Sequence, residues 1–319
     1  GWRTEMTPGL EEISRAPKVA LHDHLDGGLR PSTVATIAAE IGHHIPDDSV
    51  IFASSDQIRH SGSLTEYLDG FAHTIAVMQR PEDLVRVARE AVEDLARDGV
   101  VYAELRWAPE QHLRAGITPS GAVEFVRVGI EQGREQAASA GSPIVVNQIL
   151  TARRETGRSL EIARLAVEHR SDGVVGFDIA GAEAGYPAKD HLPAFDYAAR
   201  HQLPITIHAG EAFGIASIEQ AIDVCGANRI GHGVRIVDDI DVSDLPPKLG
   251  AVASYLRDAG VCFELCPSSN LHTGALGPDA RIADHPFALL DSCGFNVTVN
   301  CDNRLMSHTT LSREFALLV

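Results

Sequence analysis

Cysteine is scarce in this chain of 319 residues, which contains only five. None of them forms a Cys-x-x-Cys pair and no zinc-finger spacing occurs, so the sequence argues against a cysteine-based metal site or a disulfide framework. Reduced cysteines that pack as small hydrophobic residues are typical of cytoplasmic proteins, and we therefore expect a cytoplasmic location. The five are Cys225, Cys262, Cys266, Cys293 and Cys301.

Long apolar runs and an excess of positive charge are also missing. No run approaches the roughly 20 residues that a membrane-spanning helix needs, and residues 1–17 lack the apolar region of a signal peptide. The chain has 44 acidic and 27 basic residues, which gives a formal net charge of −17. An acidic surface repels phosphate backbones and anionic lipids, so we expect neither nucleic acid nor a membrane as a partner.

What the chain does contain is an alternation of short apolar runs with longer amphipathic stretches. The first predicted strand begins at Lys18 and ends in His22-Asp23-His24. Seven more predicted strands follow, at residues 100–109, 143–151, 174–180, 204–209, 230–234, 261–266 and 295–300. Because helical stretches separate most of them, the sequence predicts an α/β protein with a (β/α)8 TIM barrel, formed as a single domain over residues 1–319.

The stretch between the first two predicted strands is too long for an ordinary βα loop. Residues 31–41, 64–78 and 81–97 have helical spacing of their apolar residues, and no strand pattern interrupts them. We therefore expect a helical lid, inserted after the first strand, over about residues 30–98. The other predicted helices lie at 119–140, 159–170, 191–201, 215–225, 250–259, 282–292 and from 311 onward.

Histidines and carboxylates gather where predicted strands end. His22 and His24 are two residues apart on a strand, so their side chains point to the same face and their Cα atoms lie about 6.7 Å apart. His208 ends the fifth strand and Asp302 follows the eighth. Because the functional residues of TIM barrels lie at the carboxyl ends of the strands, we expect these four side chains to meet.

Three imidazoles and one carboxylate suit a catalytic Zn²⁺ with room for a water molecule. We therefore expect one zinc ion per chain, which would make hydroxide by lowering the pKa of its water. Glu211 lies shortly beyond His208, where it is placed to shuttle a proton. His232, at the end of the sixth strand, is expected to hold the hydroxide and stabilise developing charge.

Five motifs carry a family resemblance that spans roughly residues 17 to 315. They are His22-Asp23-His24-Leu25-Asp26-Gly27, Phe177-Asp178-Ile179-Ala180-Gly181-Ala182-Glu183, His208-Ala209-Gly210-Glu211, Gly231-His232-Gly233 and Cys301-Asp302-Asn303. Together they resemble the adenosine deaminase family, within the metal-dependent amidohydrolase superfamily of barrels. The resemblance implies zinc-dependent hydrolytic deamination of adenosine and 2′-deoxyadenosine to inosine and 2′-deoxyinosine plus ammonia, in purine salvage.

The same resemblance implies a role for each motif residue. The implied zinc ligands are His22, His24, His208 and Asp302, and the implied catalytic residues are Glu211, which protonates purine N1, with His232 and Asp302, which orient the hydroxide. The backbone N–H of Gly181 is expected to meet purine N3, and Asp26 a ribose hydroxyl. The full implied substrate-binding set is His24, Asp26, Gly181, Asn303, Leu64, Tyr67, Leu68 and Phe71, the last four of which correspond to a hydrophobic gate.

The sequence departs from the family pattern in two places. The family often has a second aspartate where this chain has Asn303, which leaves the purine preference open. The chain also stops soon after the last strand, so we expect its C-terminal helices to be truncated. Two alternatives stay open: a deaminase of adenine or of a modified purine nucleoside, and a catalytically inactive nucleoside-binding relative. The sequence leaves the oligomeric state undetermined.

Other ionisable residues are expected to have no part in the chemistry. Glu104 and Arg106 alternate along the second strand and are expected to form a buried structural pair. Asp178 and Glu183 are expected to shape the loop at Gly181 rather than to contact substrate. The histidines away from strand ends are expected to be solvated; they are His43, His44, His60, His112, His169, His191, His201, His285 and His308.

Overall fold

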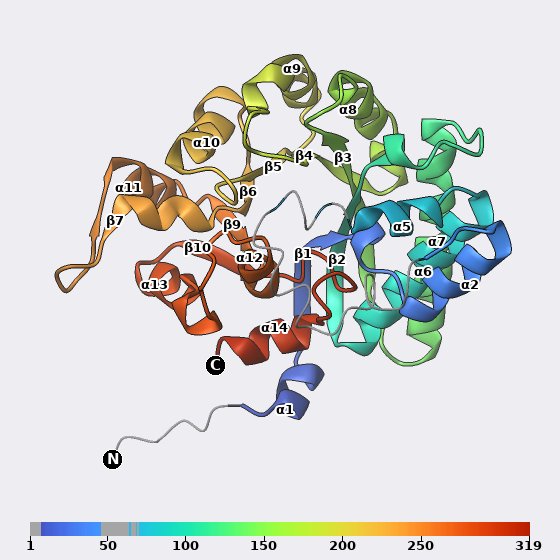
Figure 1. Cartoon of the computed structure of the whole chain (residues 1–319), viewed down its shortest axis with the longest axis horizontal. Helices are drawn as coiled ribbons and strands as arrows, with labels where there is room; N and C mark the ends of the chain where they lie inside the picture. Colours follow the sequence, from blue (N-terminus) through green and yellow to red (C-terminus); the bar gives the residue numbers. More distant parts are fainter. Residues whose placement is uncertain (1–7, 46–63, 65–67, 69) are drawn as a thin grey trace.

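Parallel strands form the centre of the molecule, and helices surround them (Figure 1). In this computed structural model the described residues are 8–45, 64, 68 and 70–319. The arrangement confirms the predicted (β/α)8 barrel, since each of the eight predicted strands is present at its expected place in the chain. Eight strands pair in parallel as two four-stranded sheets, with the orders β1-β2-β3-β4 and β10-β9-β6-β5.

The eight barrel strands differ in length between the two halves of the barrel. Those of the first half are β1 (Lys18–His24), β2 (Val100–Trp107), β3 (Val145–Arg153) and β4 (Val174–Ala180). Those of the second half are shorter: β5 (Thr206–Ala209), β6 (Arg229–His232), β9 (Cys262–Leu265) and β10 (Asn296–Val299).

Two isolated bridges join the sheets into a closed barrel. One pairs Phe177 with Ile205, between β4 and the start of β5, and the other pairs Asp23 with Asp302, between β1 and the segment after β10. At the second seam the side chain of Asn300 takes the place of a regular ladder. Its amide oxygen accepts hydrogen bonds from the backbone N–H groups of Leu21 and His22, at 2.9 and 3.0 Å. The first and last strands are therefore held together beside the His22–His24 segment.

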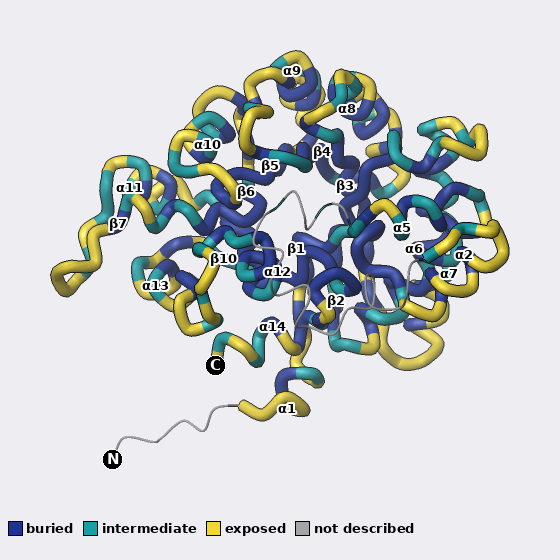
Figure 2. The backbone as a smooth tube through the Cα atoms, in the orientation of Figure 1, coloured by how far each residue is buried: buried dark blue, intermediate teal, exposed yellow. Residues whose placement is uncertain are grey.

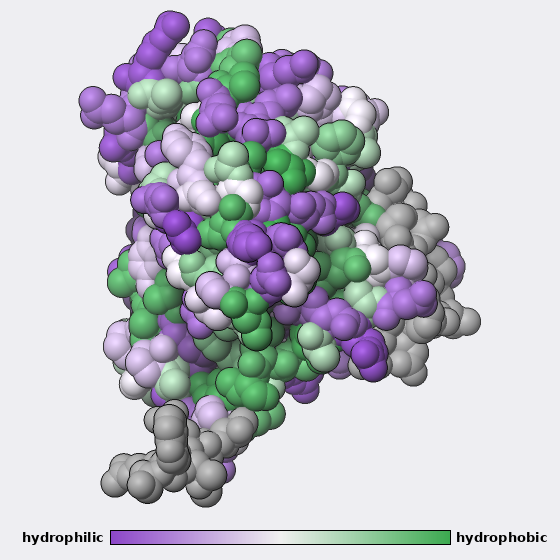
Figure 3. Space-filling view, turned by 90° about the vertical axis from the view of Figure 1, so that its left-hand side faces the viewer, coloured by the Kyte–Doolittle hydropathy of each residue, from purple (hydrophilic) through white to green (hydrophobic). Residues whose placement is uncertain are grey.

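Helices cover the outside of the barrel, and their barrel-facing sides are buried (Figure 2). They are α1 (Leu10–Arg15), α2 (Pro31–Ile41), α5 (Phe71–Ala76), α6 (Pro81–Arg97), α7 (Pro119–Ser139), α8 (Ser159–Glu168), α9 (Leu192–Arg200), α10 (Ile215–Glu219), α11 (Ala251–Asp258), α12 (Pro267–His272), α13 (Phe287–Ser292) and α14 (Leu311–Leu317). Hydrophilic side chains occupy much of the flank drawn in Figure 3, with smaller hydrophobic areas between them. None of the described helices is long and apolar enough to cross a membrane.

The alternation along β2 separates the hydrophobic core from a charged barrel interior. Leu105 and Trp107 are fully buried in the hydrophobic core cluster, while Arg106 lies between them in sequence and makes ion pairs. The expected pair of Glu104 with Arg106 is wrong. Arg106 instead binds Glu264 at 2.7 Å, and Glu104 binds Arg229. Sequence spacing along one strand cannot reveal such partners, because they come from strands across the barrel.

Several elements differ from their predicted bounds. The stretch 215–225 is divided into α10 and a π-helix at Gln220–Val224. The stretch 282–292 is divided at Pro286, which lacks a backbone N–H, into a 3-10 turn and α13. A short antiparallel hairpin of β7 (Ile240–Asp241) and β8 (Lys248–Leu249) was not predicted.

Candidate active site

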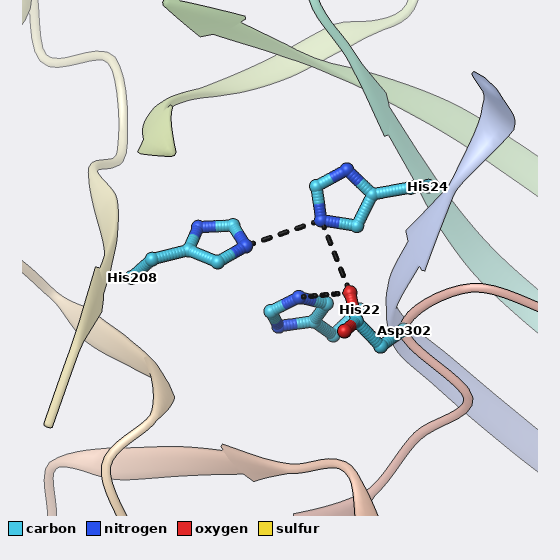
Figure 4. A group of neighbouring side chains, drawn as sticks. All are labelled: His22, His24, His208 and Asp302. Atoms are coloured by element: carbon cyan, nitrogen blue, oxygen red, sulfur yellow. Dashed lines mark hydrogen bonds and ion pairs between the residues drawn. The ribbon is translucent and has the colours of Figure 1, made fainter. Parts of the chain in front are cut away.

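The four predicted metal ligands converge at the carboxyl ends of the barrel strands. His22 and His24 come from β1, His208 from β5, and Asp302 from the segment after β10 (Figure 4). Their candidate ligand atoms all lie within 4.8 Å of one another. Oδ1 of Asp302 lies 3.2 Å from Nε2 of His22 and 3.3 Å from Nε2 of His24. Nε2 of His24 also lies 3.1 Å from Nε2 of His208.

Buried carboxylates hold two of these imidazoles from behind. Nδ1 of His22 lies 3.0 Å from Glu264 on β9, and Nδ1 of His208 lies 3.0 Å from Asp178 on β4. A carboxylate at Nδ1 fixes that nitrogen as the donor, which leaves Nε2 with its lone pair directed at the cluster. Arg106 supports both carboxylates, at 2.7 Å from Glu264 and 3.6 Å from Asp178. The charged barrel interior thus orients the cluster.

Asp302 adopts a backbone conformation that side-chain-bearing residues rarely adopt. Its φ angle is +60°, and His232 has a φ of +64°. Oδ2 of Asp302 accepts a hydrogen bond from Ser269 at 2.6 Å, which leaves Oδ1 beside the histidines. Such strain persists only where surrounding contacts enforce it and is concentrated at functional sites. Among the described residues, four that are not glycine have a positive φ, and two of them, His232 and Asp302, line the pocket at this site.

The loop that carries Glu211 is anchored by a second glutamate. One carboxylate oxygen of Glu183 accepts hydrogen bonds from the backbone N–H groups of Glu211, Ala212 and Phe213, at 2.6 to 3.1 Å. The other oxygen accepts the N–H of Gly210 at 2.7 Å and the hydroxyl of Ser217. Glu183 therefore fixes the segment between β5 and α10, although the sequence led us to expect it to shape the Gly181 loop.

The carboxyl group of Glu211 is buried beside the metal-ligand cluster. Burial, followed by the negative charges of Asp302 and Glu183, raises the pKa of Glu211 well above its usual range. Oε2 lies 3.5 Å from Nε2 of His232, and Oε1 has no hydrogen-bond partner among the described atoms. A neutral carboxyl with a free oxygen is suited to donate a proton to a bound molecule.

His232 is neutral and has a defined orientation. Burial, only partly offset by Asp302, holds its pKa well below the usual range. The side-chain amide of Asn270 lies 3.0 Å from Nδ1 of His232. When that amide donates, Nδ1 is the acceptor and Nε2 carries the proton. The N–H is then directed toward Glu211 and the cluster.

One pocket contains these groups and most of the predicted substrate-binding residues. Its lining includes the predicted residues His24, Asp26, Leu64, Leu68, Phe71, Gly181, His208, Glu211, His232, Asp302 and Asn303. Tyr67, the remaining gate residue, lies outside the described residues. His22 lies in the metal-ligand cluster and is fully buried.

Two glycines are required where the backbone approaches this pocket. A Cβ atom on Gly27 would lie 1.9 Å from Oδ1 of Asn303. Gly181 has a φ of +111°, and a Cβ atom there would lie 2.5 Å from Glu155. Any larger residue at either position would displace a side chain at the pocket.

Sequence reasoning missed several residues at this site. Gln111, Thr151 and Arg153 also line the pocket. His112 was expected to be solvated, but it is fully buried, with Nε2 at 3.8 Å from Oδ2 of Asp26. The only available signal was its place five residues beyond the end of β2 at Trp107, since the contact with Asp26 links segments 86 positions apart.

The solvation prediction is also wrong for three other histidines, which are buried: His169, His191 and His285. Each has a hydrogen-bonding partner within reach, at Ser120, Ser159 and Asn270 respectively. It holds for His44, His201 and His308, which are exposed, while His43 is partly buried and His60 lies outside the described residues.

A closed (β/α)8 barrel with histidines and an aspartate clustered at its carboxyl end defines a metal-dependent hydrolase of the amidohydrolase class. Comparison with known sequences identifies the family within that class. The family model described as adenosine deaminase matches residues 17–319. The chain therefore belongs to the adenosine deaminase family.

Curated relatives match almost the whole chain. It is 56% identical to adenosine deaminase 1 of Streptomyces coelicolor, over 98% of this chain and 79% of that protein. It is 55% identical to adenosine deaminase of Mycolicibacterium gilvum, over 97% of this chain and 86% of that protein.

Solved structures with the same fold have more varied substrates in their names. Adenine deaminase from Arthrobacter aurescens is 25% identical, with a TM-score of 0.80 over 95% of this chain and 87% of that one. The N6-methyl-AMP deaminase from Arabidopsis thaliana is 28% identical, also with a TM-score of 0.80, over 98% of this chain and 88% of that one. The fold alone therefore does not fix the purine substrate.

Proposed function

We propose that this chain catalyses the zinc-dependent hydrolytic deamination of adenosine and 2′-deoxyadenosine. Water replaces the 6-amino group, so the products are inosine or 2′-deoxyinosine and ammonia. The observation that carries the proposal is the pocket in which Glu211, whose pKa burial raises well above its usual range, lies beside the cluster of three histidines and Asp302. The relatives named adenosine deaminase, at 55–57% identity, support this choice of substrate.

The cluster has the donor chemistry of a zinc site. Nε2 of His22 is buried and has no hydrogen-bond partner among the described atoms, although it lies near Asp302. Nε2 of His24 and of His208 face each other, although the His208 ring is buried, the His24 ring is only 13% exposed, and both pKa values are lowered, first by burial. A cation that accepts all three lone pairs and the Asp302 carboxylate resolves this arrangement. When bound there, zinc lowers the pKa of a water molecule toward neutrality.

The residues around the cluster divide the proton transfers between them. Glu211 is protonated before reaction and donates its proton to purine N1, which makes C6 a better electrophile. His232, with its N–H directed at the cluster, holds the oxygen that adds to C6. Glu211 then receives the proton of that oxygen and passes it to the departing amine, so ammonia leaves and the 6-oxo product remains. The proton that the next water molecule loses as it is activated returns Glu211 to its protonated form.

Other pocket residues are proposed to orient the substrate. The backbone N–H of Gly181 contacts purine N3, and the Asn303 amide donates to N7. Asp26, whose Oδ1 has no partner among the described atoms, accepts a ribose hydroxyl beside His24. Leu64, Leu68 and Phe71 line the pocket as an apolar cover, in which we also place Tyr67.

We further propose that residues 1–319 form one barrel domain, with about residues 30–98 as its helical lid. The succession of α2, α5 and α6 between β1 and β2 supports the lid. A cytoplasmic location is proposed on the basis of the five free cysteines.

The direct experiment is to follow the ultraviolet absorbance change that accompanies conversion of adenosine to inosine by the purified protein. Adenine and N6-methyl-AMP serve as competing substrates in the same assay. We expect adenosine and 2′-deoxyadenosine to have the highest kcat/KM. Without a ribose, adenine leaves Asp26 unpaired and loses binding energy that positions the ring. Comparable kcat/KM on adenine would favour the alternative of an adenine deaminase.

A further inference from the structure

One part of the pocket wall carries charges that the proposed chemistry does not use. Arg153, the last residue of β3, lines the pocket together with Asp26, which follows β1. An aspartate carboxyl is ordinarily ionised at neutral pH. Oδ1 of Asp26 has no hydrogen-bond partner among the described atoms and lies 3.9 Å from Nδ1 of His24.

The guanidinium of Arg153 forms an ion pair with another carboxylate. Its Nε and Nη2 donate to the two oxygens of Glu155, each at 3.1 Å. Glu155 also accepts the backbone N–H of Ala182 at 2.6 Å, next to Gly181. The side chains of Arg153 and Glu155 are 23% and 25% exposed, so solvent screens this pair only in part. Two parallel hydrogen bonds hold the guanidinium in one orientation, and the carboxylate neutralises its charge.

This arrangement suits a neutral sugar hydroxyl better than a phosphate. One cation, Arg153, stands with two carboxylates, Asp26 and Glu155, so these three side chains together carry a net negative charge. A ribose hydroxyl can donate to Oδ1 of Asp26 without moving any charge. A 5′-phosphate places up to two negative charges near Asp26. Arg153 can form an ion pair with the phosphate only if its ion pair with Glu155 breaks.

The fold itself does not impose this discrimination. A barrel with a TM-score of 0.80 to this chain is named N6-methyl-AMP deaminase, so a related pocket accepts a 5′-monophosphate. The difference must therefore lie in individual side chains around the sugar.

We propose that the Arg153–Glu155 pair makes this pocket select nucleosides over 5′-monophosphates. Glu155 neutralises and immobilises Arg153, which leaves the charge of Asp26 uncompensated toward a phosphate. This inference rests on the proposed function, because it takes Asp26 to be at the sugar.

The test is Glu155→Gln, with kcat/KM measured for adenosine and for AMP. The glutamine oxygen can still accept the N–H of Ala182, so the substitution removes the charge while it keeps the loop contact. We expect the ratio of kcat/KM for AMP to that for adenosine to rise by about tenfold or more. Adding Arg153→Met to this variant is expected to abolish the gain, because the freed guanidinium is what receives the phosphate.

Glu161→Gln is the matched control. Glu161 forms a two-point pair with Arg158 at the start of α8, and both side chains are more than a third exposed, at 47% and 39%. This control loses an equivalent arginine–glutamate pair away from the pocket, so the AMP to adenosine ratio is expected to stay at the wild-type value. An unchanged ratio in folded Glu155→Gln overturns the proposal.

Binding separates a failure of this inference from a failure of the proposed function. If the wild-type protein does not deaminate adenosine, the proposed function is wrong. Selectivity is then measured from the dissociation constants of inosine and inosine 5′-monophosphate by calorimetry, in the wild type and Glu155→Gln. If Glu155→Gln does not fold, Arg153→Met gives the same test. It is expected to weaken monophosphate binding further relative to inosine, and a gain in monophosphate binding overturns the proposal.

Discussion

Single atoms with unused hydrogen-bonding capacity are concentrated at the pocket. More than nine in ten buried polar groups in proteins have a partner. Among the described atoms here, several buried ones without a partner belong to residues at the site: His22 Nε2, Asp26 Oδ1, Glu211 Oε1 and Asn303 Oδ1. An unpaired buried group costs about 1–3 kcal/mol, so their clustering indicates that bound molecules complete the hydrogen bonding.

Glu211→Gln is expected to abolish most turnover while it leaves the site assembled. The amide has nearly the same shape as the protonated carboxyl, but it cannot donate and recover a proton. We expect kcat to fall by roughly 10²- to 10⁴-fold, the usual contribution of general acid–base catalysis. Steady-state kinetics give kcat, and metal analysis is expected to find the wild-type zinc content. Near-normal turnover would remove Glu211 from the mechanism.

Asn303→Ala is expected to weaken catalysis on adenosine by about 1–3 kcal/mol in kcat/KM, since N7 loses its donor. The control is an adenosine analogue with carbon in place of N7, which has no acceptor there and is expected to be nearly indifferent to the substitution. An equal loss on both substrates would show that Asn303 acts instead through Gly27 or through the neighbouring Asp302.

At the scale of elements, the segment between β5 and α10 depends on one carboxylate from another strand's loop. Glu183 is buried and accepts five hydrogen bonds from that segment, four of them from backbone N–H groups. No regular secondary structure satisfies those four donors. Glu183 thus satisfies the backbone N–H groups of this loop, as pairing with a neighbouring strand satisfies those of a β-strand.

Glu183→Ala is expected to destabilise the protein by about 3 kcal/mol or more, because several buried donors lose their acceptor at once. The same change is expected to lower kcat more than the zinc content. Glu211 lies in the loop that loses its anchor, whereas the proposed zinc ligand His208 lies before the loop, in β5. Chemical denaturation measures the first effect, and kinetics with metal analysis the second. Glu219→Ala, which removes an exposed glutamate from α10, is the control and is expected to change the free energy of unfolding by less than about 0.5 kcal/mol.

The elements that the sequence predicted well are those with strong local patterns. The mainly apolar stretches at 100–109 and 174–180 contain β2 and β4, because short stretches rich in β-branched and aromatic residues are typical of buried strands. The two-residue strands at 240–241 and 248–249 are too short for any periodicity to appear. The break at Pro286 was readable in principle from the proline itself.

For the site, strand-end position predicted the right neighbourhood but not the contacts behind it. His22, His208 and Asp302 meet because their strands end at one face of the barrel. The burial of His112 and the pair of Arg106 with Glu264 depend on which side chains face each other across long sequence separations. No local pattern encodes that information.

At the scale of the whole molecule, the candidate metal site joins the two ends of the barrel. His22 and His24 belong to β1, and Asp302 follows β10 at the seam where Asn300 replaces regular strand pairing. His208 adds β5 from the other half-barrel. A metal bound by these residues therefore stabilises the closed barrel over any opened form.

Removal of the metal is expected to lower the melting temperature. A ligand at about 100 times its dissociation constant contributes about 2.7 kcal/mol, which for a protein of this size corresponds to roughly 4 °C. Calorimetric scans with and without a chelator measure the shift. His208→Ala is expected to melt lower than the wild type and to respond little to the chelator. If the chelator leaves the melting temperature of the wild type unchanged, a bound metal does not stabilise the fold.

The seam at Asn300 also sets the moment during translation at which activity can arise. The ribosome releases β1, with its two histidines, before every other barrel strand, and Asp302 after all of them. Until Asn300 and Asp302 have left the ribosome, the early half-barrel has no partner along one edge and the cluster has no carboxylate. The nascent chain therefore carries an open sheet edge while the strands from β2 to β10 are made, and a translation product that stops before Asp302 has no complete active site.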